Sequence, residues 1–244
     1  MPFRSLQSAE NVQSVSDECN TVPGNACSHQ ADDQSSIVSF PVGGRIKRLT
    51  DVIITLFVLP SVLIIILSTA LILKCTDPGP ILYKQFRLGY RRRAFVCFKL
   101  RTMVVDSENV LKALLESDPE SRAEWNLNQK LVHDPRVTPF GQFLRRSSID
   151  ELPQLLNVLR GDMSLVGPRP IIPSEAARYG DQLGAYFSAR PGLTGAWQVS
   201  DRDNVSYEMR VAMDAEYVRE WRFWTDVLIM LRTLGTVVDG KGCY

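Results

Sequence analysis

Histidine and paired cysteines are scarce in this chain. Its 244 residues include two histidines, His29 and His133, and five scattered cysteines that contain no C-x-x-C pair. An odd cysteine count without paired spacing argues against a disulfide scaffold and a zinc site, and it suits a reducing compartment. His133 precedes Asp134 and Pro135, a setting that favours a polar loop or capping role over catalysis. Chemistry built on histidine, zinc or disulfides is therefore disfavoured.

Charge is absent from one long run. Residues 52–73, VIITLFVLPSVLIIILSTALIL, form 22 consecutive uncharged positions. A helix of that length, at about 1.5 Å per residue, reaches about 33 Å and matches a hydrocarbon core of about 30 Å. The sequence therefore predicts a membrane-embedded helix over residues 45–75.

Two features bear on how that helix sits in the bilayer. Pro60 lies inside the run, removes a backbone donor and is expected to kink the helix. A spanning helix carries its excess of basic residues on the cytoplasmic side, but here both ends are basic. The basic residues are Arg45, Lys47 and Arg48 before the run, and Lys74, Lys84, Arg87 and Arg91 to Arg93 after it. This pattern favours a re-entrant helix whose ends both return to the cytoplasmic face, with a simple span as the alternative.

The remaining charge is unevenly distributed. Residues 1–44 have a net charge of −4, and the other 200 residues carry 27 basic against 22 acidic side chains, a net of +5. The first segment is polar without sustained apolar periodicity, so we expect residues 1–44 to be a disordered acidic tail. A basic body behind a membrane segment suits anionic lipid headgroups or phosphorylated substrates, and nucleic acid is the weaker alternative.

Apolar spacing predicts a mainly helical domain over residues 76–244. Turn residues and short apolar runs in 77–103 indicate a hairpin around Gly89, and helices are expected at 110–115, 119–131 and 148–161. Two more helices are expected near the end, and we expect their apolar faces to join the core, with a partner or the membrane as alternatives. The first face holds Val211, Ala215, Val218 and Trp221 behind a Ser206 cap, and the second holds Trp224, Val227, Leu228 and Leu231. The predicted fold class is α+β, predominantly helical, with a single N-terminal membrane helix.

The densest group of unusual residues lies in 147–170, SSIDELPQLLNVLRGDMSLVGPRP. Asp150 and Glu151 open a predicted helix, where unpaired N–H groups favour carboxylates and phosphates. Ser148 with Glu151 also forms a capping-box pattern, so helix stability alone accounts for the pair. Nearby arginines favour phosphoryl chemistry instead, because guanidinium groups bind phosphate through paired hydrogen bonds. These arginines are Arg145, Arg146, Arg160 and Arg169.

In that chemistry one carboxylate would attack phosphorus while the other holds Mg²⁺, an ion often bound by one or two carboxylates plus substrate phosphates. Gly167 to Pro170 would hold Arg169 in a rigid loop, since proline fixes its own φ and restricts the residue before it. A surface turn with a solvated arginine is the alternative for that loop.

The motifs resemble the bacterial sugar transferase family, the monotopic polyprenyl-phosphate phosphoglycosyl transferases. The resemblance covers about residues 45–244 and rests on the apolar run with its proline, D-P-G-P at 77–80, K-x-R-T-M at 99–103 and the long motif at 150–170. The segment RPGLTGAWQVSDRDNVSYEMRVAMDAEYVREW looks most like the exopolysaccharide-initiating branch that transfers galactose phosphate.

The resemblance implies a two-step reaction between a UDP-sugar and undecaprenyl phosphate on the cytoplasmic face of the bacterial membrane. Asp150 would be the nucleophile, Glu151 would bind Mg²⁺, and Lys99, Arg145 and Arg169 match positions that contact phosphate. Membrane lipids are the other expected partner, nucleic acid is not, and oligomeric state stays open. UDP-glucose is the alternative donor.

The chain departs from the family pattern in three places: Asp201-Arg202-Asp203 after Ser200, Cys243 at the penultimate position and Leu59-Pro60-Ser61 at the proline. The Asp201-Arg202-Asp203 departure leaves the preference for one UDP-sugar donor open. Its D-x-D spacing also suits a metal-dependent glycosyltransferase. That rival needs a nucleotide-binding βαβ sheet, which the helical pattern does not predict. A membrane-bound scaffold that merely holds lipid is the rival from another class, and it has no need of Asp150.

Overall fold

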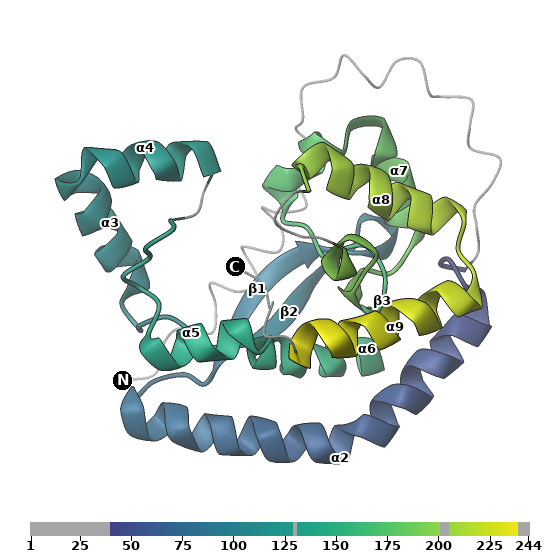
Figure 1. Cartoon of the computed structure of the whole chain (residues 1–244), viewed down its shortest axis with the longest axis horizontal. Helices are drawn as coiled ribbons and strands as arrows, with labels where there is room; N and C mark the ends of the chain where they lie inside the picture. The colour runs from purple at the N-terminus through teal and green to yellow at the C-terminus, as the bar shows by residue number, and fades with distance from the viewer. Residues whose placement is uncertain (1–39, 129–130, 201–204, 239–244) are drawn as a thin grey trace. The chain divides into compact units, whose positions relative to one another are not determined.

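The structure is a computed structural model, and it describes residues 40–128, 131–200 and 205–238 (Figure 1). Most of the predicted acidic tail lies outside these residues, as do Asp201 to Asp203 and Cys243. Contacts group the chain into two compact units. Unit 1 holds the described parts of Met1–Phe57, Gln85–Cys97 and Leu155–Thr233, and unit 2 those of Val58–Lys84, Phe98–Gln154 and Leu234–Tyr244.

The predicted membrane helix is present as α2, Gly44–Thr76, which continues without interruption through Pro60. Among the described residues it is the one helix long and apolar enough to cross a membrane, with a mean hydropathy of 2.8 over an 18-residue stretch. Its first turns are different in character, because Lys47, Asp51 and Thr55 repeat every fourth residue and are 7%, 4% and 0% exposed. Spacing of four places them on one helix face, so the start of α2 is fixed by protein contacts in unit 1.

The expected hairpin around Gly89 is confirmed. Strands β1 (Leu82–Leu88) and β2 (Ala94–Leu100) form a two-stranded sheet joined by the 3-10 turn η1 (Tyr90–Arg92). The Gly89 N–H donates to the Arg93 carbonyl at 2.9 Å and closes the connection. The hairpin places Lys99 near the end of its second strand.

Unit 2 contains a helix pair, α3 (Ser107–Ser117) and α4 (Pro119–Asn128), followed by α5 (Pro139–Arg146) and the 3-10 helix η2 (Ile149–Gln154). The predicted second helix of the pair is confirmed through Asn128; residues 129 and 130 lie outside the described part of the chain, and Leu131 is not helical. The core of unit 2 is built on Leu73, Leu100 and Leu144, with Phe140 and Ile149 packed against them. This core fixes the end of α5 beside the start of η2.

The helix predicted over residues 148–161 is divided into two. Its first part is η2, and the α-helical part, α6, covers only Leu155–Arg160. Pro153 lacks an N–H and clashes with the preceding turn of an α-helix, which explains the tighter first half. Ser148 has φ +56°, whereas an N-cap is normally extended, so the start of η2 lacks standard capping geometry.

Unit 1 continues with α6, β3 (Ser164–Val166), η3 (Pro173–Gln182), α7 (Leu183–Ser188), β4 (Gly192–Thr194), η4 (Trp197–Val199), α8 (Tyr207–Arg219) and the first part of α9 (Phe223–Val238), which passes into unit 2 at Leu234. Strands β3 and β4 pair in parallel, with Ser164 opposite Gly192 and Val166 opposite Thr194. The core is aromatic, and Tyr179 meets Tyr186 edge to face with ring centroids 5.1 Å apart.

The expectation for the last two helices is half right. The Ser206 hydroxyl caps α8 by accepting from the Met209 N–H at 3.2 Å, and Val211, Ala215 and Val218 are buried as expected. Trp221, by contrast, lies beyond the end of α8.

The apolar face expected to bury α9 is instead exposed, at 74% for Trp224, 48% for Leu228 and 61% for Leu231. The buried positions are Asp226 and Ile229, and Asp226 accepts from Lys47 Nζ at 2.5 Å and from the Tyr217 hydroxyl at 2.6 Å. A buried cation needs a paired anion, so Lys47 and Asp226 set which side of α9 faces inward.

Candidate active site

Unit 2 brings together four of the five residues that sequence motifs single out. Lys99 comes from β2, Arg145 from the last turn of α5, and Asp150 and Glu151 from the first turn of η2. Lys99 Nζ donates to Glu151 Oε1 at 2.7 Å, and both side chains are largely buried. Two carboxylates and two cations from three elements therefore meet in one place, which we call the acidic-pair site.

Asp150 is the more buried of the two carboxylates, with 7% exposure. Burial raises its pKa to about 6, and the negative charge of Glu151 adds to that rise, while the positive charges of Lys99 and Arg145 oppose it. A carboxylate with a pKa near 6 is mostly ionised at neutral pH and more basic than an ordinary aspartate. That combination suits a nucleophile.

Arg145 is held in place by two neighbours for which the sequence predicted no role. Its Nε donates to the Thr102 hydroxyl at 2.9 Å, and it lies within electrostatic range of both Asp150 and Asp134. Asp134 in turn holds Arg136 at 2.6 Å. Thr102 belongs to the K-x-R-T-M motif, so its spacing from Lys99 was an available signal, whereas nothing local marked Asp134.

A close backbone approach positions α5. A Cβ on Gly141 would lie 1.9 Å from the Thr102 carbonyl oxygen, so only glycine allows this contact. The Thr138 hydroxyl caps the helix by accepting from the Gly141 N–H at 2.9 Å. One turn later Arg145 reaches Thr102, and the left-handed turn at Ser148 then leads into Asp150.

Arg169 and Arg160 belong to unit 1. Arg169 lies in the Gly167–Pro170 segment between β3 and η3, here called the arginine loop. Its guanidinium carbon is 5.7 Å from the centre of the Trp197 ring. The alternative of a merely solvated arginine is therefore wrong, because the side chain packs on a buried indole.

The acidic-pair site offers few ligands for a metal ion. Within 40–128, 131–200 and 205–238, no group of three or more His, Cys, Asp or Glu side chains lies close enough to hold one. Asp150 and Glu151 are two oxygen donors, which fits Mg²⁺ only when substrate phosphates and water complete its shell.

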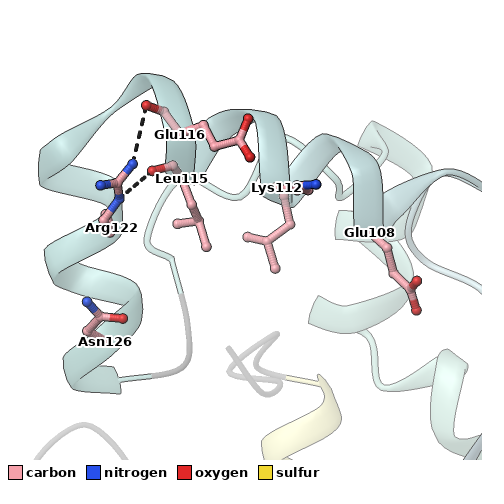
Figure 2. A pocket seen from close by; sticks show the side chains of 7 residues that line it. Glu108, Lys112, Leu115, Glu116, Arg122 and Asn126 are labelled. Atoms are coloured by element: carbon pink, nitrogen blue, oxygen red, sulfur yellow. Dashed lines mark hydrogen bonds between the residues drawn. The ribbon is translucent and has the colours of Figure 1, made fainter.

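A separate pocket of about 490 Å³ lies along α3 and α4, lined by Leu111, Leu115 and charged neighbours (Figure 2). Arg122 lines the pocket and donates to the carbonyls of Leu115 at 2.5 Å and Glu116 at 3.3 Å. None of its lining residues belongs to the acidic-pair site.

Comparison with known proteins decides the family. The model of the bacterial sugar transferase family matches residues 42–240. The chain belongs to this family. The match covers every described element, including the acidic-pair site and the arginine loop.

Relatives within the bacterial sugar transferases carry informative names. The chain is 48% identical over 189 residues to the "Undecaprenyl-phosphate galactose phosphotransferase" of Salmonella typhimurium, covering 75% of this chain and 40% of that protein. It is 42% identical over 204 residues to the "Exopolysaccharide production protein ExoY" of Sinorhizobium fredii, covering 84% and 90%.

It is also 34% identical over 211 residues to the "UDP-glucose:undecaprenyl-phosphate glucose-1-phosphate transferase" of Escherichia coli K12, covering 83% and 42%. The chain thus spans about two-fifths of the length of the Salmonella and Escherichia relatives. These names include both galactose and glucose as the transferred sugar.

Proposed function

We propose that this bacterial sugar transferase moves a sugar 1-phosphate from a UDP-sugar to undecaprenyl phosphate and so initiates exopolysaccharide synthesis. The observation that carries the proposal is the acidic-pair site, in which a buried carboxylate with a pKa of about 6 lies among two cations and a second carboxylate. The name of the Salmonella relative supports the transfer to undecaprenyl phosphate, and the name of the Sinorhizobium relative supports a part in exopolysaccharide production.

The proposed reaction has two displacements at one phosphorus atom. An Asp150 carboxylate oxygen attacks the β-phosphorus of the UDP-sugar, the bond to the bridging oxygen breaks, and UMP leaves with its electron pair. A lipid phosphate oxygen then attacks the same phosphorus and releases Asp150 as a carboxylate. A covalent phosphosugar-aspartyl intermediate divides one difficult transfer into two easier ones.

The surrounding cations have separate parts in this scheme. Arg145 and Lys99 would stabilise negative charge that develops on the phosphoryl oxygens, because cationic donors in a largely buried site are poorly screened by water. Glu151 would hold Mg²⁺, which would neutralise phosphate charge. Lys99 already neutralises Glu151 at 2.7 Å, so its ammonium would turn toward phosphate when the ion binds.

Purified protein in lipid nanodiscs tests the reaction. UDP-galactose, UDP-glucose and UDP-N-acetylglucosamine are supplied in turn with Mg²⁺ and undecaprenyl phosphate, and released UMP is measured. We expect UDP-galactose to give the fastest release, with UDP-glucose as the second candidate because of the Escherichia relative. If no donor yields UMP, the proposed function is wrong.

The covalent intermediate has its own test. Protein is incubated with a donor labelled in the sugar, without lipid acceptor, and then denatured. Wild-type protein should retain the label and Asp150→Asn should not. Equal labelling of both proteins would exclude Asp150 as the nucleophile.

We also propose that α2 is re-entrant and that the domain over 76–244 faces the cytoplasm. The exposed apolar surface of α2 and the basic residues at both of its ends support this arrangement. Single cysteines placed in residues 1–39 can be reacted with an impermeant thiol reagent on intact cells. Absence of labelling, with labelling after lysis, is expected; labelling of intact cells would mean that α2 spans.

A further inference from the structure

Hydrogen bonds hold the backbone of the arginine loop at nearly every residue. The Gly167 N–H donates to the Thr194 carbonyl at 2.9 Å, and the Pro168 carbonyl accepts from the Gly192 N–H at 2.8 Å. The Pro170 carbonyl accepts from Arg87 Nη1 at 3.0 Å. Because these contacts come from separate segments of unit 1, the backbone at Arg169 has little freedom.

Helix α8 adds two side chains to this loop from successive turns. Asp214 accepts a hydrogen bond from the Arg169 backbone N–H, and its Oδ2 accepts from the Tyr179 hydroxyl at 2.9 Å. Arg210 lies four residues earlier, so it projects from the same face of α8. The helix therefore presents a second guanidinium group to the neighbourhood of the first.

Trp197 joins the two cations. The guanidinium carbon of Arg169 is 5.7 Å from the centre of its ring and that of Arg210 is 4.6 Å away, so the two charges lie within about 10 Å of each other. The indole is only 6% exposed, which excludes it as a stacking platform for a nucleobase. Its ring instead supports both guanidinium groups.

Arg210 also has an unused donor. Its Nε is buried and has no hydrogen-bond partner within the described part of the chain. A buried donor without a partner is costly, and two neighbouring cations repel, so both features are relieved when an anion binds. A diphosphate suits this pair because each of its phosphoryl groups can accept from one planar guanidinium group.

We propose that Arg210 and Arg169 form a two-arginine subsite for the diphosphate of the nucleotide sugar, with Arg210 as a binding residue. The proposal rests on the proposed function, of which it specifies the donor subsite. Asp214 is a positioning residue in this arrangement, since it holds the Arg169 backbone and does not contact the donor.

Binding of UDP to full-length protein in nanodiscs, measured by calorimetry, tests the subsite without turnover. Arg210→Gln is expected to weaken UDP binding at least about tenfold, because a charge-assisted hydrogen bond is lost. Arg210→Lys keeps the charge but not the planar fork and should weaken it about threefold or more. The matched control is Arg219→Gln on the same helix, whose side chain bonds Gln182, and it should bind UDP like wild type.

Thermal unfolding of each variant separates binding from folding. If Arg210→Gln unfolds, Arg210→Lys decides alone, since it preserves the positive charge beside the Trp197 ring. Wild-type affinity in either folded Arg210 variant, or an equal loss in Arg219→Gln, would overturn the subsite. UDP binding requires no turnover, so a failure of UMP release from every donor would defeat the proposed function while leaving the subsite to be judged by UDP binding.

Discussion

The acidic-pair site and the arginine loop are held in different ways. Asp150 and Glu151 are surrounded by side chains, with Lys99 2.7 Å from Glu151 and Arg145 within electrostatic range of Asp150. The arginine loop is held through its backbone, whose N–H and carbonyl groups bond to β4 and Arg87. We therefore expect changes of charge to have the larger effect in the acidic-pair site, and changes in close backbone packing to have the larger effect in the arginine loop.

The largest effect should come from the acidic-pair site. Asp150→Asn should lower UMP release at least about 10³-fold, because the proposed nucleophile is lost. Its thermal unfolding midpoint should stay the same or rise, since a buried carboxylate that resists ionisation is removed. Asp181→Asn, at an exposed position, is the control and should change neither quantity. A large fall in stability with Asp150→Asn would mean that this carboxylate is structural.

The next effect concerns the backbone of the arginine loop. A Cβ on Gly192 would lie 2.1 Å from the Gly167 nitrogen and 2.3 Å from the Thr194 carbonyl oxygen. Gly192→Ala should therefore destabilise the protein by about 3 kcal/mol, seen as a lower thermal midpoint. Gly184→Ala is the matched control, because nothing lies within 4 Å of its Cβ position, and it should be neutral or stabilising. Equal midpoints for the two variants would contradict a loop held by close backbone contact.

A smaller, more specific effect is expected in the pH profile. The kcat/KM for the donor should fall about tenfold per pH unit below about pH 6, as Asp150 takes up a proton. Lys99 lowers and Glu151 raises the pKa of Asp150. Lys99→Met should therefore move the acidic limb of the profile, the fall in kcat/KM at low pH, to higher pH, and Glu151→Gln should move it to lower pH. Profiles of released UMP measured on all three proteins provide the comparison. A limb that stays in place in both variants would show that Asp150 is not the titrating group.

The smallest effect should be at Asp214. Burial raises its pKa to about 7, so at neutral pH it is already about half protonated. Asp214→Asn should then cost less than about 1 kcal/mol, because an amide oxygen can still accept from the Arg169 N–H. Because the folded-state pKa is raised, the contribution of Asp214 to the free energy of unfolding decreases as the pH rises from about 4 to about 7. The variant should lack that decrease. Unfolding curves over this pH range would show it, and a cost of several kcal/mol would mean that charge holds the loop after all.

Some features followed from local sequence because their causes are local. The uncharged run at 52–73 specified α2, turn residues specified the hairpin around Gly89, and Ser206 specified the start of α8. The adjacent Asp150 and Glu151 were visible as a pair, and the family motifs placed Lys99 and Arg145 with them. For the helix, the hairpin, the cap and the adjacent carboxylates, the residues that determine the structure lie close together in the chain, whereas Lys99 was placed only by the family motif.

Other features depended on partners distant in the chain. Sequence periodicity assigned the apolar side of α9 to the core, but Lys47, 179 residues away from Asp226, turns the acidic side inward. The pKa of Asp150 depends on burial and on Lys99, which no local pattern reveals. Arg210, Trp197 and Asp214 likewise gain their meaning only where α8 meets the arginine loop. The sequence by itself determined which residue types and helices are present, whereas tertiary structure decided which charges are buried together, because burial and Coulomb energy depend on distance in space.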